Sequence, residues 1–181
     1  MRVFSRYVEA VTALNNRIGH LSAFLVIPIF LLLLLEVGLR YLAGSPTVWT
    51  NELAQMLFGA YVLLAGGFLL ANGGHANVDI LHGRFRPRQR AAVDVFTSTL
   101  MFAFVGALLY FSSSMAWESV SRLEHSMSAW NPPVWPLRLL IPIATALLLL
   151  QGLAKLIVDL QVLFGRTPPQ SAGTLSAEDA S

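Results

Sequence analysis

The sequence has no cysteine, and only 12% of its residues are charged. Without cysteine, disulfide bonds, thiol catalysis and cysteine metal sites are all excluded. Soluble domains carry about 25% charged residues, so the low charge argues against a soluble fold. The formal net charge of +2 is also too small to indicate a nucleic-acid partner.

Long apolar runs take up most of the chain. They lie at about 19–40, 52–71, 94–117 and 137–164. A helix needs about 20 apolar residues to cross hydrocarbon, and these runs do not alternate as the strands of a membrane barrel would. The sequence therefore predicts an all-α integral membrane protein, with four transmembrane helices in one membrane domain at 19–164.

Two shorter segments flank this domain. In residues 1–18 apolar side chains recur at intervals of three and four, while Arg2, Arg6 and Arg17 fall on other faces. We expect this amphipathic arm to lie flat in the cytoplasmic interface; the alternative is that it simply starts the first span. Residues 165–181 are polar and rich in Pro, Ser and Ala, which is typical of a disordered tail.

The arginines predict how the chain crosses the membrane. One side has only Arg40, Arg122 and Arg138, and the other has Arg2, Arg6, Arg17, Arg84, Arg86, Arg88, Arg90, Lys155 and Arg166. Because basic residues accumulate on the cytoplasmic side, both termini should be cytoplasmic. The first span is too long for a signal-peptide core and lacks a following cleavage site, so we expect it to remain as a membrane helix.

Glu36, Arg40 and Glu52 form the strongest local pattern of charges. Glu36 and Arg40 are four residues apart and share a helix face, and the short turn returns Glu52 to a similar depth. Membrane charges are usually paired, so we predict a structural bridge from Arg40 to both carboxylates. Such a bridge implies that Arg40→Ala harms assembly more than Glu36→Gln. A cation or proton site is the alternative interpretation.

Other residues suit the membrane boundary or contacts between helices. Tyr41, Trp49 and Trp135 are typical interface anchors. Small residues on one stripe allow close helix approach, and a proline inside a span bends it. Residues predicted to pack helices or contact a partner are Gly59, Gly66, Gly106, Pro142 and Gln151, and Pro28 is expected to kink the first span.

The four histidines do not predict a cofactor. A bis-histidine haem needs two imidazoles at matched depth, but His20, His75, His82 and His125 all fall at boundaries or in loops. His75 and Asp79 are four residues apart, and two ligands are too few for a metal site. We expect these two residues to order the inner loop, which joins the second and third spans. No nucleophile, base and orienting group occur together, so the sequence predicts neither an enzyme, nor a metal, nor a cofactor.

Three stretches resemble a known family. They are Arg40-Tyr41 with Ser45 to Ala54, Gly74 to Leu81, and Pro136 to Pro142 with Leu150-Gln151. With four spans and inside termini, the chain resembles the small membrane subunit of tripartite ATP-independent periplasmic (TRAP) transporters, although Ala144 stands where the family pattern has a glycine.

This resemblance implies a non-catalytic scaffold subunit in a bacterial inner membrane. Its partners would be a large multi-span membrane subunit, which carries substrate and sodium, and a periplasmic substrate-binding protein that captures an organic anion such as a carboxylate. Membrane lipid would surround the chain. Two other functions stay open: a membrane anchor of a redox complex that binds haem or quinone near His20 and His75, and a small exporter acting alone as a homodimer.

Overall fold

The computed structural model describes residues 2–73 and 87–163, and this part of the chain is helical apart from its connections. The helices are α1 (Arg2–Ala23), α2 (Val26–Tyr41), α3 (Trp49–Ala71), α5 (Pro87–Ser121) and α6 (Trp135–Leu163). Four stretches are long and apolar enough to cross a membrane, namely Phe4–Tyr41, Trp49–Ala71, Val95–Ser121 and Trp135–Val162. The predicted all-α fold with four membrane-crossing helices is confirmed.

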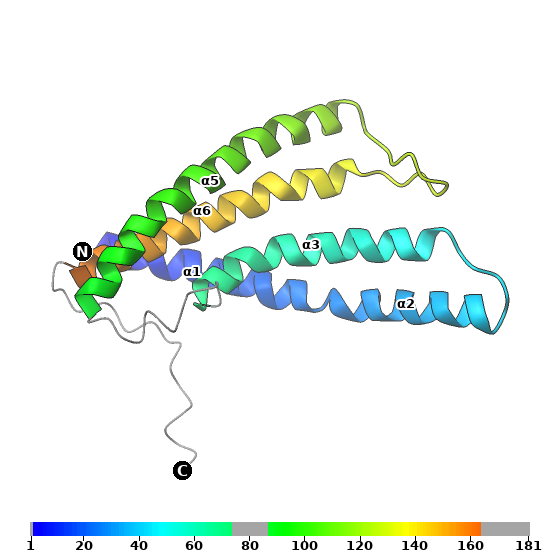
Figure 1. The fold of residues 1–181 in the computed structure, drawn as a ribbon, viewed down its shortest axis with the longest axis horizontal. Coiled ribbons are helices and arrows are strands. Elements are labelled where there is room, and N and C mark those ends of the chain that lie inside the picture. The colour runs from blue at the N-terminus through cyan, green and yellow to red at the C-terminus, as the bar shows by residue number, and fades with distance from the viewer. Residues whose placement is uncertain (1, 74–86, 164–181) are drawn as a thin grey trace, which may run out of the picture.

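The spanning helices form an open row rather than a closed bundle. Helix α5 packs along α6, α6 along α3, and α3 along α2, while α1 contacts both α3 and α6 (Figure 1). Helix α1 begins at the same end of the row at which α6 finishes; we call this the terminal end. The α2–α3 turn and the α5–α6 connection lie at the opposite end, the loop end. Most four-helix proteins close around a common core. Here the described helices cover only part of the row, where α1 packs on α3 and α6.

Pro28 explains why the first membrane stretch consists of two helices. Proline has no backbone N–H, so the carbonyl of Phe24 loses its normal partner four residues on. The N–H of Ile27 donates to that carbonyl instead at 3.2 Å, and α1 ends at Ala23 before α2 begins at Val26. The predicted kink therefore appears as a break one turn before the proline.

Two further prolines mark α5 and α6. Pro87 is the first residue of α5, so this helix begins several residues before the apolar run predicted at about 94–117. The first position of a helix tolerates proline because its N–H would be unpaired there anyway. Pro142 lies inside α6 and cannot donate to the carbonyl of Arg138.

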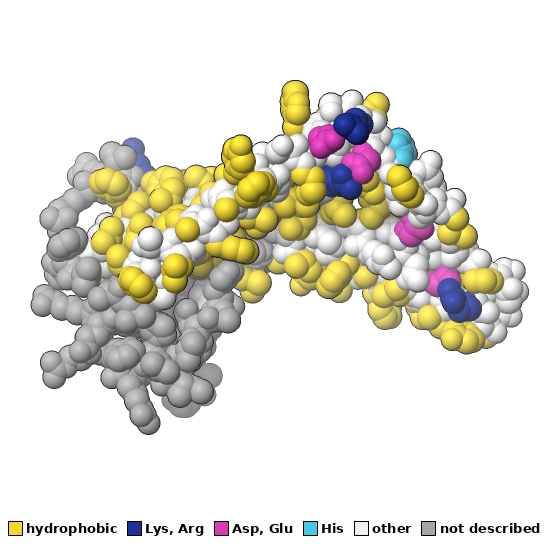
Figure 2. Space-filling model, turned by 45° about the horizontal axis from the view of Figure 1, so that its top comes forward, with side chains coloured by type: hydrophobic (Ala, Val, Ile, Leu, Met, Phe, Trp, Pro, Cys, Tyr) yellow, Lys and Arg dark blue, Asp and Glu magenta, His cyan; other side chains and the backbone are white. Residues whose placement is uncertain are grey.

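Small side chains pack between the helices, and large apolar ones face outward. The α5 face against α6 buries Ser98, Val105, Ser112, Ala116 and Ser119, and α6 buries Ala144, Gly152 and Ala154. In lipid no hydrophobic force drives helices together, so close contact between small residues stabilises them instead. Figure 2 shows hydrophobic side chains over much of the visible face, with most of the visible charged groups near the loop end.

Candidate functional site

Glu36 is the centre of a polar cluster at the loop end of α2 and α3. It is 5% exposed, and its Oε1 accepts hydrogen bonds from Arg40 Nε, at 3.1 Å, and from Arg40 Nη2. Its Oε2 accepts from the Thr47 backbone N–H at 3.2 Å, the Thr47 hydroxyl at 2.6 Å and the Thr50 hydroxyl at 2.7 Å. This Glu36 cluster (Glu36, Arg40, Thr47 and Thr50) ties the last turns of α2 to the first turn of α3.

Glu52 does not complete the predicted bridge. Arg40 pairs with Glu36, whereas Glu52 Oε2 accepts a hydrogen bond of 2.6 Å from the Ser128 hydroxyl. Glu52 follows Thr50 by two residues, which turns it about 200° around the helix and away from α2. The arginine therefore joins one carboxylate of the predicted three-residue cluster, and the second carboxylate reaches the α5–α6 connection.

That connection, residues 122–134, is an ordered loop, which we call the outer loop after its predicted side of the membrane. The Val134 N–H donates to the Glu124 carbonyl at 3.0 Å, and the Ser126 N–H donates to the Pro132 carbonyl at 2.8 Å. The Glu124 carboxylate pairs with Arg138 of α6. These bonds, with the one from Ser128 to Glu52, fix the loop to both α3 and α6.

The predicted interface anchors lie around this loop end. The rings of Trp49 and Trp130 are tilted against each other with centroids 6.5 Å apart. Tyr41 is 78% exposed at the end of α2, and Trp135 is partly buried at the start of α6. Aromatic residues at this level are typical of a membrane–water boundary.

We predict that Glu52→Ala loosens the outer loop without unfolding the helices. It removes a hydrogen bond to a charged acceptor, a loss of about 1–2 kcal/mol at a partly exposed site. Hydrogen exchange in detergent should then become faster in residues 122–134. The control is Gln55→Ala, an exposed position one turn further along α3. Equal exchange in both variants would contradict the role assigned to Glu52.

A second group of polar residues joins α1 to α6 in the half of the row that is nearer the terminal end. Asn15 is 1% exposed, and its Nδ2 donates to Gln151 Oε1 at 3.1 Å and to the Val11 carbonyl at 3.1 Å. Gln151 Nε2 donates in turn to the Thr12 hydroxyl at 3.2 Å. We call Thr12, Asn15, Gln151 and the adjoining Gly67 the inner junction.

Gly67 is part of this junction because it has no side chain. A Cβ built on Gly67 would overlap Asn15 Oδ1. That buried oxygen has no N–H or O–H donor within residues 2–73 and 87–163. It lies against the Gly67 backbone, at a distance that only glycine permits. Contacts of this type between an oxygen and a Cα–H are weakly favourable at close helix crossings.

Further contacts hold α1 against α3 beside the junction. A Cβ on Gly19 would overlap the Phe68 ring, so α1 and α3 also approach closely here. The Asn72 side chain donates to Asn16 Oδ1 at 2.9 Å. The face of α1 toward α3 and α6 therefore packs on protein, while Arg17 is exposed on another face.

The predicted packing residues take different positions. Gly59 faces Leu137, whose Cδ1 would lie 3.5 Å from an added Cβ. Within the described residues, nothing lies within 4 Å of that position at Gly66 or Gly106. Gln151 is in the inner junction. The sequence did not predict Asn15 or Gly67 as part of this site, because nothing in it distinguishes one asparagine of an amphipathic helix or one glycine of a pair. His75 and Asp79 lie outside the described residues, as does the tail at 165–181.

The described histidines are far from one another. His20 Nδ1 is 2.6 Å from the Asn16 carbonyl at the terminal half, and its ring meets Phe68 edge-on. His125 lies in the outer loop at the other end, with Nδ1 2.7 Å from the Leu123 carbonyl. In the described part of the chain, no three His, Asp or Glu residues gather as a metal site would require. These positions do not favour a haem between two helices.

Comparison with known proteins decides the family. The model of tripartite ATP-independent periplasmic transporters, DctQ component, matches residues 29–162, which is more than half of the chain. The chain belongs to this family. It is thus the small permease subunit of a TRAP transporter and a multi-pass protein of the inner membrane.

A curated relative agrees with this assignment. The sialic acid TRAP transporter small permease protein SiaQ of Vibrio cholerae serotype O1 is 21% identical over 100 residues. The aligned part covers 53% of this chain and 58% of the relative's length. Within this TRAP small permease, the family match includes the Glu36 cluster and Gln151, whereas Asn15 and Gly19 of α1 precede it.

Proposed function

We propose that this TRAP small permease is a non-catalytic scaffold of a sodium-driven, binding-protein-dependent importer of organic anions such as carboxylates. A large multi-span membrane subunit would move substrate and sodium, and a periplasmic substrate-binding protein would deliver the substrate. The small permease would widen the fixed part of the membrane complex. SiaQ is named for an organic acid, which supports this class of substrate.

The use of the buried polar groups carries the scaffold proposal. In the membrane-crossing helices Glu36, Thr50, Gln151 and the Asn15 amide nitrogen are buried and bond to groups of this same chain, while Asn15 Oδ1 lies against the Gly67 backbone. A transport site needs polar groups that are free to bind and release a solute or an ion. Here the polar groups lock α2 to α3 and α1 to α6, as a rigid brace requires.

The charges support cytoplasmic termini. At the loop end, Arg40, Arg122 and Arg138 pair with Glu36, Glu118 and Glu124 respectively. At the terminal end, Arg6 and Arg17 are exposed on α1, where they can meet anionic lipid of the cytoplasmic leaflet. With the terminal end inside, α1 packs against its neighbours near the cytoplasmic surface and the outer loop faces the periplasm.

Co-purification tests the scaffold assignment. A tagged copy expressed from its native locus and extracted in mild detergent is expected to bring down a much larger multi-span membrane protein. In liposomes, the chain alone should take up no organic anion, while the complex with the binding protein and a sodium gradient should do so. Purification with a haem protein, or uptake by the chain alone, would contradict the proposal.

A further inference from the structure

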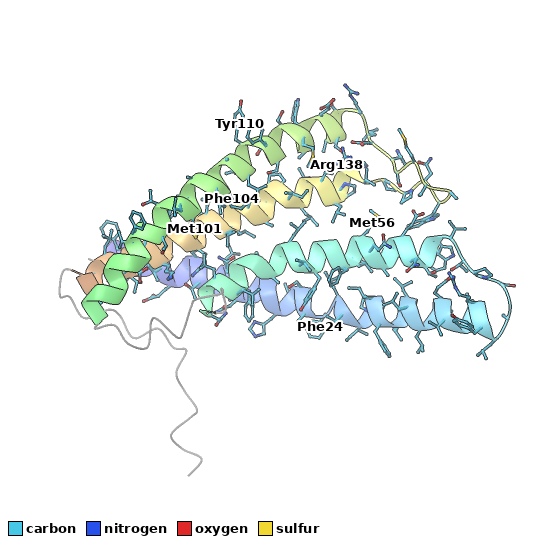
Figure 3. All side chains as sticks on the ribbon, viewed as in Figure 1. Phe24, Met56, Met101, Phe104, Tyr110 and Arg138 are labelled. Atoms are coloured by element: carbon cyan, nitrogen blue, oxygen red, sulfur yellow. The ribbon has the colours of Figure 1, made fainter. Side chains whose placement is uncertain are left out.

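Helix α5 forms one edge of the row, and no other described helix covers its outer face. Its inner face, including Ser98, Val105 and Ser112, packs along α6. On another side a shallow groove runs along the helix, and its walls come from Gly106, Leu109, Tyr110, Ser113, Ser114 and Trp117. Tyr110 is 72% exposed and Trp117 is 77% exposed. In Figure 3 the Tyr110 side chain points away from the other helices.

The groove lies at the depth of the hydrocarbon. The apolar stretch Val95–Ser121 has 27 residues, about 40 Å of helix, and residue 108 is its middle. Tyr110 is therefore within about 3 Å of the centre of the stretch along the helix. Tyrosine is common at membrane boundaries, where its hydroxyl reaches water, but at this depth water is out of reach.

Two hydroxyls in the groove have no partner in the described part of the chain. Ser113 donates to the Leu109 carbonyl at 2.6 Å, but neither the Tyr110 hydroxyl nor the Ser114 hydroxyl makes a hydrogen bond there. Lipid tails offer no acceptor, and an unpaired polar group in hydrocarbon is costly. A helical serine can bond to the carbonyl four residues back, as Ser113 does, so it is the Tyr110 hydroxyl that calls for a protein neighbour with a hydrogen-bonding group.

A second copy of the chain would bring like groups together in the groove. Two copies in one membrane are related by an axis along the membrane normal, so each residue meets its own counterpart at equal depth. Tyr110 would then face Tyr110, and the open space at Gly106, one turn away along the helix, would face another open space. Such a symmetric pair places no bulky side chain opposite the space beside Gly106, whereas a helix of a different protein can do so.

We infer that the α5 groove receives one transmembrane helix of the large membrane subunit. That helix would carry a hydrogen-bond acceptor for the Tyr110 hydroxyl and a bulky apolar side chain for the space beside Gly106. The inference rests on the proposed function, because it names the surface through which the small permease joins its partner.

Site-specific photo-crosslinking tests the inference in the intact complex. The probe is benzoylphenylalanine placed at Tyr110 or at Ser114, in membranes that contain all three proteins of the transporter. The matched control is Phe30 on α2, at the other edge of the row. Phe30 is 61% exposed and lies eleven residues before the end of α2 at Tyr41, as Tyr110 lies eleven residues before the end of α5 at Ser121.

We expect the two α5 probes to form an adduct with the large subunit and the Phe30 probe to form none. Adducts only with a second copy, only with lipid, or equally from Phe30 would overturn the inference while leaving co-purification intact. A chain that never co-purifies with a large subunit overturns both the proposed function and the inference.

Two substitutions add an independent readout. Gly106→Leu should fill the groove and abolish co-purification. Gly38→Leu on α2, another glycine with no described residue within 4 Å of its Cβ position, should leave co-purification unchanged. Tyr110→Phe removes only the hydroxyl and should weaken association about threefold, the effect of one interhelical hydrogen bond in a membrane. Normal association of a monodisperse Gly106→Leu protein would contradict the assignment.

Discussion

Gly67→Val is expected to release α1 from the rest of the protein, whereas Gly66→Val should leave it in place. A valine at position 67 would overlap Asn15 Oδ1, and Asn15 is held from the other side by its bond to Gln151. Relieving the overlap moves α1 away from α3 and breaks the hydrogen bonds of the inner junction. Overpacking of this kind costs about 1–3 kcal/mol, and lost buried hydrogen bonds add about 1 kcal/mol each.

The neighbouring glycine is a close control. Gly66 precedes Gly67 in α3, and nothing in the described part of the chain lies within 4 Å of its Cβ position. Both substitutions change helix propensity equally and lie at nearly the same depth. Size-exclusion profiles and thermal unfolding in detergent should show Gly67→Val as aggregated or strongly destabilised and Gly66→Val as close to the parent. Equal behaviour of the two variants would show that the inner junction does not hold α1.

Glu36→Ala should destabilise the protein more than Arg40→Ala. Removing Glu36 takes the acceptor from Arg40, from both threonine hydroxyls and from the Thr47 N–H. Each buried donor that loses its acceptor costs about 1–3 kcal/mol, and Glu36→Ala leaves several such donors at once. Removing Arg40, which is half exposed, leaves the carboxylate with its donors from Thr47 and Thr50, so the loss should be nearer 1–2 kcal/mol.

This order reverses the one that the predicted arginine bridge implies, because the carboxylate rather than the guanidinium has the larger number of partners. Thermal unfolding of purified Glu36→Ala, Glu36→Gln and Arg40→Ala separates the two accounts. Glu36→Gln retains one acceptor oxygen and should lie between the other two. An Arg40→Ala protein less stable than Glu36→Ala would favour a role for the arginine beyond its bond to Glu36.

The sequence predicted what depends on local chemistry. Run length and hydropathy located four membrane-crossing helices, because hydrocarbon permits few other backbones. Pro28 predicted a kink in the first stretch, where the structure has a break between α1 and α2, since its missing N–H acts within one turn. The four-residue spacing of Glu36 and Arg40 predicted their contact for the same reason, because neighbours on a helix face are fixed by helix geometry alone.

What the sequence did not predict depends on how the helices meet. Hydropathy contains nothing that separates an open row from a closed bundle. Gly66 and Gly67 differ only by about 100° around α3, yet Gly67 faces Asn15, whereas no described residue lies within 4 Å of a Cβ at Gly66. The sequence pairs Glu52 with Arg40 because the two residues lie at a similar depth. That Glu52 points away from α2 follows only from how α3 is rotated about its axis in the packed structure. Only the packed structure specifies these directions.

Uptake per assembled complex tests the central claim, that this chain braces a transporter and does not form its path. Proteoliposomes would contain the large subunit, the binding protein and either the parent chain or the Arg40→Ala variant, with the amount of complex measured in each. We predict the same KM for the organic anion and the same dependence on sodium for both proteins. Any loss of total uptake should be explained by a smaller amount of assembled complex. A fully assembled variant with an altered KM or sodium dependence would contradict the claim, because it would place part of the transport path within this chain.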